Sequence, residues 1–303
     1  MDSNGVSAYA LTTPEYLQHR RVEQPWVIEP ILPVGGSALI FGAPKAGKSY
    51  LALQMAAAIT GETDEWLGFA ACQRGVVLFV EVDVGKTMWQ DQHCSILAEA
   101  GYPLEAVYHA DRDMIPWPFD ILQEECQAAL RYLVATVKPL VVFIDTIRKI
   151  HTGDENDSGH MKEVTVAVQD CSSPAAVVYV GHSRKPKEDS GNDVRNEMRG
   201  SNYMTGEMDC NIQCLWRGKA MELAGRAVED QRITTQRTPY LWERNEVDEQ
   251  FKAQLACVMQ DRTLVTARAK ARELTRVSRK PEETCRSAVR RAMEVLGRGI
   301  SQW

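Results

Sequence analysis

SALIFGAPKAGKSYLALQMAAAIT, residues 37–60, is the most informative stretch of this 303-residue chain. Its middle, GAPKAGKS at 42–49, matches the pattern GxxxxGK[ST], with an apolar run before it and an alanine-rich helical stretch after it. Glycines in such a loop let backbone N–H groups surround phosphate oxygens, and the following helix adds the positive end of its dipole. The stretch therefore predicts a strand, a phosphate-binding loop (P-loop) and a helix in succession.

Individual positions of this loop have expected roles. Lys48 should reach the β- and γ-phosphates of a nucleoside triphosphate, and the hydroxyl of Ser49 should ligate Mg²⁺. We therefore expect ATP and Mg²⁺ as cofactors. The residues predicted to bind the nucleotide are Gly42, Ala43, Pro44, Lys45, Ala46, Gly47, Lys48, Ser49 and Tyr50.

Further apolar runs, at 76–80, 140–144 and 177–180, indicate more strands. Continuous apolarity is typical of strands covered on both faces, as in a parallel sheet with crossover helices. Helices are predicted between the strands, at 48–60, 121–137 and 161–171. A fifth strand at 211–216 and an edge hairpin at 219–224 and 231–235 should extend the sheet. The predicted fold is α/β, with a mainly parallel sheet flanked by helices.

Two of these strands end in a carboxylate. Asp145 follows the run at 140–144, the placement that brings an aspartate to Mg²⁺ in P-loop enzymes, although a strand-terminal Asp also caps helices. Glu81 ends the run at 76–80 and is the predicted base that polarises the attacking water, because carboxyl ends of neighbouring strands converge on the nucleotide. Asp83, two residues later, is the competing candidate.

The run at 177–180 is followed by His182 and a basic loop that begins Ser183-Arg184-Lys185. A lone histidine is more often structural than functional. At the end of this strand, however, His182 could sense the γ-phosphate and pass that state to the loop.

Composition and charge narrow the class of protein. The 44% hydrophobic and 25% charged residues are ordinary for a soluble globular chain, and the scattered cysteines favour reduced thiols over zinc ligands. No leader-like segment or run of about 20 apolar residues is present, so we expect a cytoplasmic protein without membrane association. Residues 251–303 hold 12 Lys and Arg against 5 acidic residues, a net charge of +7, which leaves −13 on the first 250 residues. Basic segments of this kind commonly face nucleic acid, although a solvated helical surface gives the same count.

The motifs together resemble the RecA-like ATPases of the RepA-type hexameric replicative DNA helicases, over roughly residues 31–237. The residues that carry the resemblance are GAPKAGKS, the Glu81 strand, FIDTIRKI with the trailing GDENDSGHM, VGHSRKP, and RGSNYMTGEMD at 199–209. The resemblance implies a RecA-like core and ATP hydrolysis between subunits of a ring. It also implies that the loops after Asp145 and His182 face DNA in a central channel.

Helicases of this wider class carry a Lys-x-Arg element late in the core, which reaches the neighbouring subunit's γ-phosphate. The matching stretch here is ITTQR at 233–237, where Thr235 replaces the lysine. Arg237 is therefore the predicted arginine finger, with Arg217 and Lys219 as substitutes. A surface arginine on an edge strand is the alternative.

Three regions are expected along the chain: an N-terminal extension (1–30), the ATPase domain (31–240) and a basic C-terminal domain (251–303), with TPYLWERNEVDEQ at 238–250 as a linker. Helical patterns at 251–261, 265–275 and 281–296, followed by 297–300, weakly resemble a winged-helix domain. The same pattern also suits a helical cap that packs on the ATPase core.

The leading functional interpretation is an ATP-dependent DNA-translocating motor, a replicative helicase of a plasmid, phage or other mobile element. Its expected partners are single-stranded DNA, duplex DNA through the C-terminal domain, and further copies of the chain in a hexameric ring. A recombinase-like or regulatory ATPase that does not unwind DNA is one alternative. A P-loop ATPase or kinase without a DNA partner is the other.

Overall fold

The computed structural model describes residues 13, 24–102, 104–116, 118–183, 202–215, 220–238, 241–244, 246–260, 267–278, 285 and 289. Among these residues, no helix has both the length and the apolar character needed to cross a membrane.

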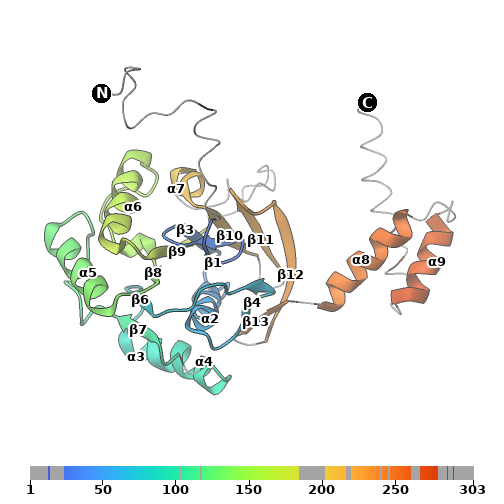
Figure 1. The fold of residues 1–303 in the computed structure, drawn as a ribbon, viewed down its shortest axis with the longest axis horizontal. Helices are drawn as coiled ribbons and strands as arrows, with labels where there is room; N and C mark the ends of the chain where they lie inside the picture. Colours follow the sequence, from blue (N-terminus) through green and yellow to red (C-terminus); the bar gives the residue numbers. More distant parts are fainter. Residues whose placement is uncertain are drawn as a thin grey trace.

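A nine-stranded sheet organises the described chain, in the order β13-β12-β11-β10-β3-β9-β8-β6-β7 (Figure 1). The run from β10 to β7 is parallel, whereas β11, β12 and β13 continue it in antiparallel fashion. This confirms the predicted α/β core with a mainly parallel sheet. The strands are β3 (Ser37–Gly42), β6 (Val77–Glu81), β7 (Val107–Ala110), β8 (Val141–Asp145), β9 (Ala176–His182), β10 (Cys210–Cys214), β11 (Ala220–Gly225), β12 (Gln231–Thr238) and β13 (Leu241–Arg244).

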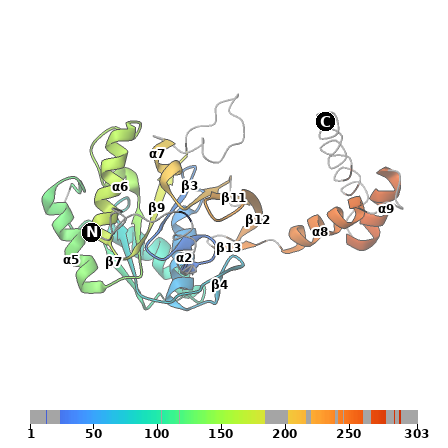
Figure 2. The same ribbon diagram turned by 45° about the horizontal axis from the view of Figure 1, so that its top comes forward.

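Both faces of the sheet are covered, which explains why the central strands are continuously apolar. Along β3, Ala38 and Ile40 belong to one buried cluster, and Leu39 and Phe41 belong to the other. The first cluster includes α2 (Lys48–Thr60), α3 (Lys86–Trp89) and α4 (Ser95–Glu99), and the second includes α5 (Glu124–Val137), α6 (Ser158–Ser172) and α7 (Asn202–Glu207). Figure 2 shows α5 and α6 side by side, away from α2.

Two short pairings complete the core beside α2. Strands β1 (Trp26–Ile28) and β2 (Leu32–Pro33) form one antiparallel pair, and β4 (Glu65–Trp66) and β5 (Phe69–Ala70) form the other. Val27 and Ile28 are fully buried in the same cluster as α2. Residues just before position 31 are therefore part of the ATPase core and not only an extension to it.

The three helices predicted between the strands are present in the structure as α2, α5 and α6. Local backbone conformation and hydrogen bonds explain where they begin. Helix α2 has the predicted bounds, with Gly47 and Gly61 in left-handed conformations at its two ends. Helix α6 begins at Ser158, because the Asp157 carboxylate accepts hydrogen bonds from the backbone N–H groups of Gly159 and His160. Helix α5 begins at Glu124, three residues later than predicted.

Two strands of the nine-stranded sheet were not predicted from the sequence. Strand β7 forms one edge of the sheet, beside β6. Strand β13 lies in the stretch predicted to be a linker, and it forms the other edge by pairing with β12. The linker prediction is wrong at this point because one large side chain, Trp242, is buried to 1% exposure within an otherwise polar stretch. The hairpin of β11 and β12 is present, but it is not the edge of the sheet.

The C-terminal helices pack on one another. Helix α8 (Glu246–Gln260) and α9 (Ala267–Ser278) share a small apolar cluster that includes Val258 and Leu274. Figures 1 and 2 draw this pair apart from the sheet. Most of the third helical pattern and the stretch at 297–300 lie outside the described residues, so the winged-helix interpretation remains a prediction.

Candidate nucleotide-binding and catalytic site

The predicted site residues come together at one edge of the sheet, where the parallel strands β3, β6, β8 and β9 end. The strand register pairs Glu81 with Asp145, and Gly42 with His182. Residues 43–47 leave β3 at this edge and lead into α2. The register therefore places the P-loop, two carboxylates and one imidazole beside one another, as the sequence predicted.

The P-loop has the backbone expected of a phosphate cradle. Lys45 and Gly47 adopt positive φ angles of 63° and 93°. Gly42 leaves no room for a side chain, because a Cβ there would lie 2.6 Å from the carbonyl oxygen of Cys214. No side chain caps α2 at Gly47, and its first turn holds no acidic residue. The first N–H groups of a helix lack intrahelical acceptors, so this end of α2 suits phosphate oxygens.

Lys48 lies inside the loop and is only 7% exposed. Its Nζ donates to the carbonyl oxygens of Gly42 at 3.2 Å and Ala43 at 3.1 Å, and lies 3.4 Å from Nδ1 of His182. Burial lowers the pKa of Lys48, against the smaller raising effects of Cys214, Asp145 and Asp83. A phosphate in the cradle would favour the charged ammonium, because it supplies the negative charge that burial has removed.

Ser49 and Asp145 form the candidate metal site. The Ser49 hydroxyl donates to Oδ2 of Asp145 at 2.7 Å, and Asp145 is 4% exposed. Burial raises the pKa of Asp145 to about 6, although the bonds to Ser49 and the charge of Lys48 act in the opposite direction. Hydroxyl and carboxylate oxygens suit Mg²⁺, which usually completes its shell with water and substrate phosphates. The described residues hold no cluster of three or more His, Cys, Asp or Glu that could hold a metal, so phosphate oxygens and water would supply the remaining ligands.

Glu81 is almost completely buried, with 1% exposure. Its Oε1 accepts hydrogen bonds from the backbone N–H groups of Asp83 and Val84, both at 2.8 Å, whereas its Oε2 is buried without a hydrogen-bond partner. Burial raises the pKa of Glu81 to about 7, more than the two backbone hydrogen bonds lower it. The competing Asp83 side chain is exposed. Glu81 thus has a fixed orientation and one unused oxygen, which suits a base for a bound water.

The remaining predicted residues are less fully described. His182 ends β9 beside Lys48, and the basic loop that follows it lies outside the described residues from 184 onward. The backbone of Arg237 lies in β12, whereas Arg217 and Lys219 lie outside the described residues. Tyr50 points its hydroxyl to the carbonyl of Gln92, so only its backbone is available to a phosphate. The role of Arg237 as an arginine finger remains a prediction.

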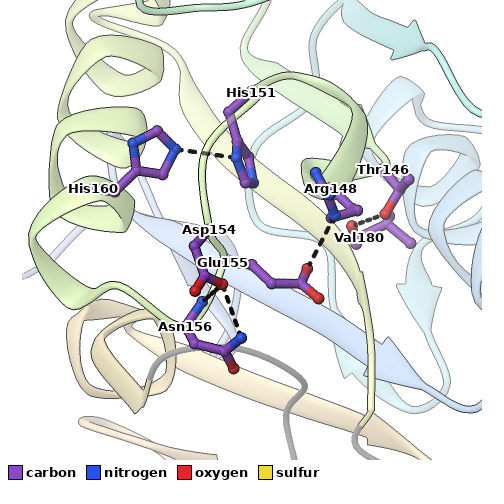
Figure 3. Close-up of polar contacts among 8 residues, drawn as sticks. All are labelled: Thr146, Arg148, His151, Asp154, Glu155, Asn156, His160 and Val180. Atoms are coloured by element: carbon purple, nitrogen blue, oxygen red, sulfur yellow. Dashed lines mark hydrogen bonds and ion pairs between the residues drawn. The ribbon is translucent and has the colours of Figure 1, made fainter.

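The segment after Asp145 is fixed by several polar contacts (Figure 3). The Thr146 hydroxyl donates to the carbonyl of Val180 at 2.8 Å, and Arg148 pairs with Glu155 at 3.7 Å. Nε2 of His160 lies 3.1 Å from Nδ1 of His151. Within this segment the 3-10 turn Ile147–Lys149 leaves Arg148 and Lys149 exposed.

One contact to the P-loop comes from outside the predicted motifs. The indole Nε1 of Trp242 donates to the carbonyl oxygen of Gly47 at 3.0 Å. Gln54 of α2 holds the backbone of Trp242 through both atoms of its side-chain amide. The sequence offered only one signal for this contact, a tryptophan in a polar stretch after a hairpin.

Comparison with known families agrees with this geometry. A family model described as an AAA domain matches residues 7–188, which is more than half of the 303-residue chain. No curated protein matches the chain. The chain belongs to this AAA domain family and contains a P-loop ATPase domain.

Proposed function

We propose that this ATPase is a DNA-translocating motor of the replicative helicase kind, which uses ATP and Mg²⁺. One observation carries the proposal: the 3-10 turn that follows the candidate metal ligand Asp145 exposes two cations, Lys149 and Arg148, of which Arg148 pairs with Glu155. The exposed cations of this turn suit the phosphates of a polyanion better than a small neutral acceptor.

The same segment is mechanically connected to the nucleotide site. Thr146 is bonded to β9, and Ile147 and Ile150 are buried on either side of the two cations. Because this connection is packed and hydrogen-bonded, a displacement of Asp145 should also displace the exposed turn. Coupling through a short, packed element of this kind is what a motor needs to link hydrolysis to a step along DNA.

Two further features support the proposal. The basic C-terminal region, with its charge of +7, supplies a second surface for nucleic acid, and we propose that it binds duplex DNA. The resemblance to hexameric helicases supports a ring of identical subunits, in which Arg237 completes the neighbour's site. An arginine supplied in trans would stabilise the charge spread over the transferred phosphoryl group.

The test measures ATPase activity with and without single-stranded DNA, for the wild type and for Lys149→Gln. We expect stimulation by DNA in the wild type and weaker stimulation in the variant. The slope of the logarithm of DNA affinity against the logarithm of salt concentration should become shallower by about 0.7 for each lost phosphate contact. Lys138→Gln is the matched control, because Lys138 is an exposed lysine just before the amino end of β8, at the opposite edge of the sheet. Equal stimulation in all three proteins would refute a role for the turn.

A forked duplex separates the proposed function from its alternatives. Strand separation that requires ATP identifies a helicase, whereas DNA-stimulated hydrolysis without strand separation identifies a recombinase-like or regulatory ATPase. ATPase activity that no DNA or RNA alters would contradict the whole nucleic-acid proposal.

A further inference from the structure

Strand β13 lies at the edge of the sheet, so one side of its backbone has no neighbouring strand among the described residues. At Trp242, a side chain takes the place of that neighbour. Nε2 of Gln54 donates to the Trp242 carbonyl at 3.2 Å, and its Oε1 accepts from the Trp242 backbone N–H at 2.8 Å. Gln54 is 7% exposed, so both bonds are shielded from water. The middle of β13 is therefore fixed to α2.

The indole ring of Trp242 extends this attachment to the P-loop itself. Its Nε1 donates to the carbonyl of Gly47 at 3.0 Å, and the N–H of Leu51 donates to the same carbonyl at 3.0 Å. A carbonyl oxygen has two lone pairs, and both are used here. The first bond belongs to the helix, whereas the second reaches across 195 residues of sequence.

The orientation of the Gly47 carbonyl matters because of its peptide plane. In a trans peptide, the C=O of Gly47 and the N–H of Lys48 point in opposite directions within one rigid plane. Gly47 has φ of 93°, a conformation at which glycine has wide freedom to rotate. A donor that holds the carbonyl on the protein side therefore holds the Lys48 N–H on the phosphate side.

We propose that Trp242 is a positioning residue for ATP binding, which acts by fixing the Gly47–Lys48 peptide through its indole N–H. It does not touch the nucleotide. Its effect should fall on phosphate binding in the ground state and the transition state alike, because a backbone N–H of the phosphate cradle would contact the phosphate oxygens both before and during hydrolysis. Loss of such uniform binding raises KM and leaves kcat nearly unchanged.

The test compares Trp242→Phe with Trp66→Phe. Both tryptophans are at least 98% buried and line the same cavity, but the indole N–H of Trp66 has no hydrogen-bond partner. The two variants therefore lose a similar ring, and only Trp242→Phe removes a hydrogen bond. We measure KM and kcat for ATP without DNA, the dissociation constant of a non-hydrolysable ATP analogue, and the thermal midpoint of each protein.

For Trp242→Phe we expect KM and the dissociation constant to rise roughly two- to tenfold, the effect of one intramolecular hydrogen bond, with kcat within about twofold of the wild type. Trp66→Phe should leave both constants unchanged. Equal shifts in the two variants, or a lower kcat at unchanged KM for Trp242→Phe, would overturn the proposal.

A second variant covers the case in which Trp242→Phe does not fold. Gln54→Met keeps the length of the side chain and releases the Trp242 backbone without altering the indole ring. It should raise the dissociation constant in the same direction, since β13 then no longer holds the ring against Gly47. Unchanged nucleotide affinity in a folded Gln54→Met protein would also overturn the proposal. Neither outcome bears on the DNA proposal, because no DNA is present.

Discussion

The pH dependence of ATP hydrolysis offers a direct test of Glu81 as the base. Burial raises the pKa of Glu81 to about 7 from its ordinary 4.5. The carboxylate is the form that can accept a proton from water, and a raised pKa means that this form is lost as the pH falls through 7. An exposed glutamate would remain ionised over the whole of that range.

The expected magnitude follows from the fraction of Glu81 that is ionised. With a pKa of about 7, about nine in ten molecules carry the carboxylate at pH 8 and about one in ten at pH 6. The kcat/KM for ATP, which reports the free enzyme, should therefore fall about tenfold between these values. Asp145, whose pKa is raised to about 6, is itself about half protonated at pH 6 and steepens the fall there, so the slope assigned to Glu81 is read between pH 6.5 and 8, where Glu81 alone gives a fall of about fourfold.

The assay measures kcat/KM at constant ionic strength for the wild type, Glu81→Gln and Asp83→Asn. The amide of Glu81→Gln keeps the shape of the side chain but cannot accept a proton, so nucleotide binding should persist while turnover falls by about 10²- to 10⁴-fold. Asp83→Asn is the matched control, an exposed carboxylate two residues away that undergoes the same chemical change. It should keep both turnover and the pH dependence. Loss of turnover in Asp83→Asn with normal activity in Glu81→Gln would refute the reasoning and assign the base to Asp83.

Three other predictions concern single residues. Lys48→Ala should abolish phosphate release from ATP, because a methyl group cannot replace the ammonium at the β- and γ-phosphates, and normal turnover would remove that role. Mixed rings of Arg237→Ala and Lys48→Ala subunits should regain activity where intact halves meet, whereas co-assembled mixtures no more active than either variant would argue against a site shared between subunits. His151 should stabilise the fold above pH 6.5. Burial, and after it His160 and Arg148, lowers its pKa to about 4 from 6.5, although Asp120 opposes the shift. The unfolded chain therefore takes up this proton first, and up to about 3 kcal/mol of unfolding free energy is lost as the pH falls from 6.5 to 4. His151→Gln should flatten that part of the stability profile in urea unfolding, and an unchanged profile would contradict the assignment.

The parts of the fold that local sequence controls were predictable. Helix α2 has its predicted bounds because glycines with left-handed backbone flank a run of good helix formers. The central strands could be recognised because both of their faces are buried, which makes every position apolar.

The edges of the sheet could not be predicted in the same way. Strand β7 buries only Val107 and Ala110, and β13 buries only Trp242. With so few buried positions, no periodicity distinguishes these strands from loops. Their place in the sheet depends on neighbours that are distant in sequence, which is tertiary information.

The candidate site likewise has features that the sequence predicts and features that only the structure shows. The positions of Asp145 and Glu81 followed from the rule that parallel strands end at one edge. Sequence alone could not decide between Glu81 and Asp83 as the candidate base, because the two carboxylates are only two residues apart. The structure distinguishes them by the burial of Glu81 and by its hydrogen bonds from the backbone N–H groups of the turn. The turn after β6 buries Glu81 and leaves Asp83 in solvent.

The contact between Trp242 and Gly47 also bears on how the C-terminal region could respond to nucleotide. Strand β13 pairs Trp242 with Arg237 of β12, and it is followed by α8 after a single residue. If the hydrogen bond from the indole N–H to Gly47 favours the phosphate-binding conformation of the loop, then bound phosphate must favour that hydrogen bond by the same free energy. This follows because linkage is reciprocal. Strand β12, which carries the proposed arginine finger, and the start of α8 are thus joined to the P-loop through β13 and the side chain of Trp242. A ring motor requires such a connection, since each subunit's DNA contacts and its neighbour's catalysis must both depend on whether ATP is bound.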